Sequence, residues 1–205
     1  MRTPVQSRSA SSADRMVDAT LTLLDEGGTP AVTVAAVARA AGSSNGSLYH
    51  RFGDRHGLLR AAQERALAAI QSETAEAFDR ADTEPDDDLA VRLLAHAAVD
   101  IFTRHRGAMR AFLVSPESPE IEQRSREATH ALSVLVTGWL GSRLGADPAR
   151  AQAAWRMLHA LGATRALLDD EHVSPTRLDV DVLADALGRA VLAVVAPERL
   201  SAAAG

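Results

Sequence analysis

The run AGSSNGSLYHRF at positions 41–52 gathers many side chains that could recognise another molecule. Its serine hydroxyls, the Asn45 amide and the Tyr49 phenol can each donate and accept hydrogen bonds. Arg51 and, shortly after, Arg55 add positive charge. Together these groups suit a polyanion that offers phosphates as well as hydrogen-bonding base edges.

The elements that position these side chains are predicted to be two short helices. Thr33 is a suitable N-cap for the first, in which apolar residues of 34–41 repeat at i, i+3, i+4 and i+7. Gly42 ends this helix after about two turns. A second short helix is expected from about Ser44 to Arg51.

Two short helices joined by a glycine-containing turn are typical of a helix-turn-helix. The N-terminal residues of the second helix can then enter a DNA major groove about 12 Å wide. Small residues allow close approach to the duplex, while Leu48 and Phe52 anchor the inner face. An ordinary inter-helix turn, with Tyr49 and Phe52 both in the core, is the alternative. The order of cap, helix, glycine turn, helix and Tyr-x-x-Phe-x-Asp-Arg favours DNA binding.

Over about residues 14–60 the sequence resembles the TetR family of transcriptional regulators. The resemblance rests on Thr33–Ala38, Ala40–Ser44, Gly46–Tyr49, Phe52, Arg55 and Leu58–Leu59, with the Gly27-Gly28 break before them. It implies a homodimer that binds a pseudo-palindromic operator in double-stranded DNA and is released by a small-molecule effector. It also implies phosphate contacts from Thr33, Ser44 and Tyr49 and base readout by Asn45, Ser47 and His50. Gly46, Arg51 and Arg55 complete the predicted DNA-binding set, Arg55 standing where the family usually has lysine.

The rest of the chain predicts about nine helices in all and no alternating strand, so the fold class is all-α. Residues 1–13 are expected to form a flexible N-terminal arm, 14–55 the helix-turn-helix DNA-binding domain, and 56–200 a helical ligand-binding and dimerisation domain. The first helix is expected to start at Asp14 and the long fourth helix after Asp54. Gly57 is a poor helix residue and is expected to loosen the DNA-binding head.

Bulk composition limits the classes of protein. The chain has 205 residues, 46% of them hydrophobic, which is enough for a buried core. It has no cysteine, which excludes disulfides and thiolate sites, and no apolar run of membrane-spanning length. A cytoplasmic protein is expected. The first 60 residues hold seven arginines against five acidic residues, whereas the remainder is acidic, as suits an anion-binding head on a soluble scaffold.

The C-terminal part carries weaker signals. Its bulky side chains could line a ligand cavity or simply fill the core; the candidates for ligand binding are Phe102, Met109, Phe112, Trp139, Trp155 and His159. Its histidines show no metal-ligand spacing and no catalytic constellation stands out, so no metal, cofactor or enzymatic activity is predicted. Small residues interspersed with Leu and Val in the last two helices favour a four-helix interface between two subunits.

The sequence therefore predicts a homodimeric repressor that a small molecule releases from its operator. Two alternatives remain open: a helical small-molecule carrier or enzyme without DNA binding, and an activator with the same DNA-binding head.

Overall fold

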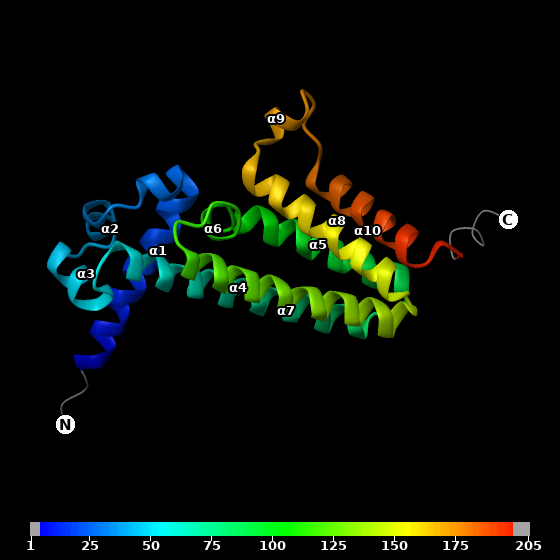
Figure 1. Cartoon of the computed structure of the whole chain (residues 1–205), viewed down its shortest axis with the longest axis horizontal. Coiled ribbons are helices and arrows are strands. Elements are labelled where there is room, and N and C mark those ends of the chain that lie inside the picture. Colours follow the sequence, from blue (N-terminus) through cyan, green and yellow to red (C-terminus); the bar gives the residue numbers. More distant parts are fainter. Residues whose placement is uncertain (1–4, 199–205) are drawn as a thin grey trace. The chain divides into compact units, whose positions relative to one another are not determined.

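The structure, a computed structural model, describes the backbone of residues 5–198 and the side chains of residues 12–198 (Figure 1). Every regular element in this part of the chain is helical, which confirms the all-α prediction. The elements are α1 (Val5–Ala31), α2 (Val34–Ala40), α3 (Asn45–Phe52), α4 (Arg55–Thr83), α5 (Asp87–Arg104), α6 (Arg106–Met109), the π-helix η1 (Arg110–Val114), α7 (Pro119–Leu144), α8 (Pro148–Leu167), α9 (Asp170–Val173) and α10 (Val180–Val195).

Three details differ from the prediction. Helix α1 begins at Val5 rather than Asp14, so residues 5–13, assigned to an arm, are helical; they contain no glycine or proline that would stop a helix. The predicted sixth helix is one turn of α-helix followed by η1, and α9 is an extra short turn. The count is therefore ten α-helices in the described residues rather than nine.

The chain divides into two compact units. The head unit comprises residues up to Ala69 together with Arg106–Glu122, and the body unit comprises Ile70–His105 and the residues from Gln123 on. Helix α4 belongs to both, since the boundary falls within it. The head unit thus extends beyond residue 55, where the sequence placed the boundary, because Leu58 and Leu59 of α4 are fully buried in its core.

The core of the head unit is formed by α1, α2, α3, the first turns of α4 and the 106–122 segment. Its largest fully buried side chains are those of Met16, Leu24, Leu48, Leu58, Leu59 and Ile121. The end of α1 is bent at Gly28, whose φ of 65° is readily adopted only by glycine, and this confirms the predicted break. Val32, the first residue after α1, is buried and lies in the short connection to α2.

The body unit has its own core. Helix α10 packs against α5 and α8, with Ala95, Val99, Ala184 and Leu187 forming one buried cluster. A second cluster surrounds Trp139. Two separate cores explain why the chain resolves into two units.

Candidate DNA-binding surface

The helix-turn-helix has the predicted local structure. Thr33 caps α2, its Oγ1 accepting a hydrogen bond from the Ala36 amide at 3.1 Å. Gly42 has a φ of 60°, a left-handed conformation that lets the chain turn sharply after α2. Ser44 then caps α3, its Oγ accepting from the Ser47 amide at 3.2 Å. Thr33 is therefore the cap that the sequence predicted, and α3 begins within one residue of its predicted start.

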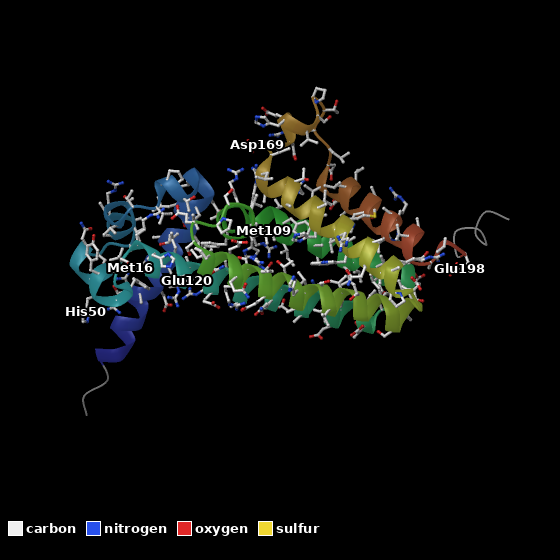
Figure 2. The ribbon with its side chains drawn as sticks, in the orientation of Figure 1. Met16, His50, Met109, Glu120, Asp169 and Glu198 are labelled. Carbon is white, nitrogen blue, oxygen red and sulfur yellow. The ribbon has the colours of Figure 1, made fainter. Side chains whose placement is uncertain are left out.

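Burial alternates around α3 as a recognition helix requires. Leu48 is 0% exposed, and Phe52 packs against the same core, so the inner face is anchored as predicted. Asn45 and His50 are exposed, and Tyr49 is 53% exposed. Figure 2 labels His50 among these outward residues of α3. The polar side of the helix is thus free to meet another molecule.

The remaining predicted contacts differ in accessibility. Thr33, Ser44 and Gly46 are exposed, whereas Ser47 and Arg51 are half-buried. The hydroxyls of Thr33 and Ser44 act as acceptors in their capping bonds. Since a hydroxyl keeps its own proton when it accepts, each can still donate to a phosphate oxygen.

Arg55, one of the predicted DNA-binding residues, makes several hydrogen bonds within the head unit. Its Nε donates to the Val32 carbonyl oxygen at 2.6 Å and its Nη2 to the Thr29 carbonyl oxygen at 2.8 Å. Its Nη1 and Nη2 also bind the two carboxylate oxygens of Glu117, at 2.5 and 3.0 Å. The guanidinium therefore joins the start of α4 to the end of α1 and to the segment before α7.

Electrostatics reinforce this pairing. The hydrogen bonds from Arg55 hold the pKa of the Glu117 carboxyl below its usual value, against the opposing effect of burial. The same contact raises the pKa of Arg55. Beside it, His56 Nε2 lies 2.8 Å from Glu120 Oε2, and this hydrogen bond lowers the pKa of Glu120. Sequence reasoning missed both carboxylates, because no local pattern links residues more than 60 positions apart.

Gly57 has a structural role that its low helix propensity does not indicate. A Cβ at this position would lie 2.0 Å from the Phe52 carbonyl oxygen. The Gly57 amide donates to Asp54 Oδ1 at 2.8 Å, closing the cap of α4. Glycine therefore permits the end of α3 and the start of α4 to approach closely.

Further contacts brace the helix-turn-helix. Arg15 on α1 donates from Nε to the Ala41 carbonyl oxygen at 3.2 Å, satisfying the C-terminal end of α2. Arg65 on α4 pairs with Asp14 and, at 2.9 Å, with Asp18 on α1. These bonds hold α2 and α4 against α1.

The predicted ligand-binding residues are divided between the two units. Met109 and Phe112 belong to the head unit, where Phe112 is buried in the core. Trp139 lies in the body core, with its Nε1 donating to Asp82 Oδ1 at 2.7 Å and its ring against Phe78.

The other three candidates are associated through α8. The Trp155 and His159 rings lie 5.6 Å apart between centroids, and Phe102 packs against Gly162 on the same helix. Burial lowers the pKa of His159. Among residues 12–198, no three His, Asp or Glu side chains are placed to share a metal ion.

An exposed polar helix, anchored by Leu48 and held behind a capped glycine turn, defines a helix-turn-helix DNA-binding protein. Residues 16–62 match the model for bacterial regulatory proteins of the tetR family. In this DNA-binding region the chain is similar to transcriptional regulators of that family.

Known proteins of similar sequence and structure agree. The HTH-type transcriptional regulator BetI of Burkholderia cenocepacia (strain HI2424) is 28% identical over 174 residues, covering 71% of this chain and 89% of the relative. A TetR-family transcriptional regulator from Mesorhizobium loti superimposes with a TM-score of 0.74 at 16% identity, covering 91% of this chain and 98% of that one. The fatty acid degradation regulator FadR of Bacillus halodurans superimposes with a TM-score of 0.68 at 14% identity, covering 94% of this chain and 97% of that one.

The relatives that carry these names are transcriptional regulators. No helix within residues 5–198 combines the length and apolar composition needed to cross a bilayer.

Proposed function

We propose that this regulator is a homodimeric repressor that leaves its operator when a small molecule binds. The observation that carries the proposal is the outward polar face of α3. Asn45, Ser47 and His50 are the candidates to read base edges, while Thr33, Ser44 and Tyr49 are the candidates to contact phosphates. Phosphate contacts set the register of a protein on DNA and base contacts supply its specificity.

Dimerisation through α8 and α10 is supported by the outer faces of these two helices. Met157 on α8 is 42% exposed, and Val182 on α10 is 51% exposed. Around each lie exposed alanines at helical spacing, namely Ala153 and Ala160 on α8 and Ala186 and Ala193 on α10. Small and apolar faces on two packed helices suit a self-complementary four-helix interface between identical subunits.

An effector site in the body unit is supported by Phe102, Trp155 and His159. Their aromatic surfaces gather along one side of α8, where Gly162 leaves room for the Phe102 ring. Because burial lowers the pKa of His159, its imidazole is neutral near pH 7 and can donate or accept a hydrogen bond. These groups suit a largely apolar ligand with a polar end.

The coupling between ligand and DNA would run through α4, which contributes residues to both units. A dimer must meet two half-sites about 34–36 Å apart, so a shift of a few ångströms between its heads weakens simultaneous docking. The ligand acts by favouring the arrangement that does not fit the operator.

Footprinting on the DNA that flanks its own gene tests the proposal, first at several salt concentrations and then against a panel of small molecules. We expect a protected site with two related halves, steep loss of affinity with salt, and release by one class of compound. Transcription measured with and without that compound separates a repressor from an activator. A carrier or enzyme would give no footprint and no salt-dependent DNA binding.

The base-reading role is tested by Asn45→Ala. If Asn45 reads a base edge, this variant should lose about 1–3 kcal/mol of preference for the operator over unrelated DNA. Tyr49→Phe, which removes a predicted phosphate donor at a position 53% exposed, is the matched variant: it should weaken binding to all sequences alike. Equal, sequence-independent losses from both variants would remove Asn45 from the readout.

A further inference from the structure

At the start of α4 the side chains of Arg55 and His56 are both already paired with carboxylates. Arg55 is paired with Glu117 and His56 with Glu120, and both acids come from the segment that leads into α7. All four residues lie within the head unit. In a protein that binds phosphates, a carboxylate that already binds a cation competes with phosphate for it.

We propose that Glu117 lowers the affinity of the protein for DNA, because its carboxylate competes with the phosphates of the DNA backbone for the guanidinium of Arg55. The proposal rests on the DNA-binding role of the head and adds a residue that lowers affinity without touching a base.

The geometry of Arg55 indicates that Glu117 is an exchangeable partner and not a permanent structural one. Its bonds to the Val32 and Thr29 carbonyl oxygens fix the guanidinium against the helix-turn-helix. The two bonds to Glu117 use Nη1 and Nη2 in the bidentate arrangement that a phosphate would also use. The main-chain bonds can stay in place while the second partner is exchanged.

Accessibility supports the same conclusion. The side chains of Arg55 and Glu117 are each 35% exposed, so the pair is open to solvent and to an incoming anion. A paired guanidinium contributes little net charge, and the neighbouring carboxylate of Glu120, which is well exposed, repels phosphate. Removing the Glu117 charge therefore frees one cation and deletes one repulsive group at the same place.

The position of Glu117 is defined by its surroundings. It lies between Pro116 and the first residue of α7, Pro119, which restrict the backbone on either side. Ile121, two residues into α7, is buried in the head core, and Gln63 of α4 donates to its carbonyl oxygen at 2.8 Å. The carboxylate is thus held opposite Arg55 by the packing of the segment.

The test measures binding of the full-length protein to its operator and to an unrelated duplex over a range of salt concentrations. The variants are Glu117→Gln, Arg55→Ala and their combination. The control is Glu26→Gln, which makes the same charge change at an exposed position elsewhere in the head unit. Thermal melts followed by circular dichroism establish that each variant is folded.

We expect E117Q to bind both duplexes more tightly than wild type. The slope of log K against log salt should steepen by about 1 for each subunit, because one new phosphate contact forms. R55A should leave the slope of the wild-type protein nearly unchanged and abolish the gain in E117Q. E26Q should gain only the smaller, general effect of added positive charge.

The outcomes separate this inference from the proposed function. If no variant binds DNA, the proposed function fails. If the wild-type protein binds and E117Q has the slope of E26Q, Glu117 has no such role. A loss of slope in R55A alone would show that Arg55 already contacts phosphate, and it would overturn the inference even if E117Q did not fold.

Discussion

Replacing Gly57 by alanine gives a direct test of the helix-turn-helix packing. At an unconstrained helical position this change stabilises a protein by up to about 1 kcal/mol, because alanine has the higher helix propensity. In this structure the added Cβ would lie 2.0 Å from the Phe52 carbonyl oxygen and 3.1 Å from the carbonyl carbon. Both atoms are main chain, so no side-chain rotation relieves the clash.

The size of the effect follows from the required movement. Cβ atoms essentially never approach another heavy atom closer than 3.0 Å, so α3 and α4 must separate by about 1 Å locally. Overpacking of this kind costs about 1–3 kcal/mol. It also displaces Phe52, which packs against the core around Leu48. We expect Gly57→Ala to lower the free energy of unfolding by about 1–3 kcal/mol and to weaken DNA binding.

Urea unfolding followed by circular dichroism measures this change. The control is Gly138→Ala on α7, where an added Cβ meets no atom within 4 Å and should stabilise by about 0.5–1 kcal/mol. The two substitutions are chemically identical, so propensity alone predicts gains for both. If G57A raised the urea midpoint as G138A does, the close approach of α3 and α4 would be refuted.

Three further changes have defined outcomes. The pKa of Glu117 is lowered in the folded protein, so the unfolded chain binds more protons as the pH falls. The stability difference between wild type and E117Q, about 0.5–1 kcal/mol after solvent screening, should therefore be full above the ordinary pKa of a glutamate and be lost in urea titrations as the pH falls through the lowered pKa of Glu117. Trp139→Phe removes the donor to Asp82 and should destabilise the body unit by about 2 kcal/mol, read from its Trp155 fluorescence during unfolding. Met157→Glu should convert the proposed dimer to a folded monomer in sedimentation; an unchanged dimer would place the interface elsewhere.

The parts of the fold that were predictable depend on short-range signals. The caps Thr33 and Ser44 act on amides three residues ahead, and the Gly42 turn is set by its own φ angle. The inward position of Leu48 follows from helical periodicity alone. A recognition helix could therefore be identified, with its outer face, before any tertiary contact was known.

The parts that were not predictable depend on contacts between distant residues. Nothing adjacent to Arg55 indicates that Glu117, 62 positions away, would take its guanidinium. Phe112 has a bulky side chain of the kind that can line a ligand cavity, yet it is part of the head core. The sequence indicates only that Gly57 has a low helix propensity, whereas its role depends on the Phe52 carbonyl oxygen, which lies close to it in the fold. In each case the type of residue was noted, but its role was decided by packing.

The 106–122 segment, which contains Phe112, belongs to the head unit although the residues on either side of it belong to the body unit. The segment is fixed to the rest of the head by polar bonds at both ends: the Gly107 amide donates to Asp25 Oδ1 at 3.0 Å, and Gln63 binds the Ile121 carbonyl oxygen. It also contains the π-helix η1, a form of backbone that is often found at functional sites. Its two ends continue into α5 and α7, whose remaining residues belong to the body unit. If a ligand acts on the body unit as proposed and displaces either helix, it would act on the head through this segment, which contains Glu117, as well as through α4.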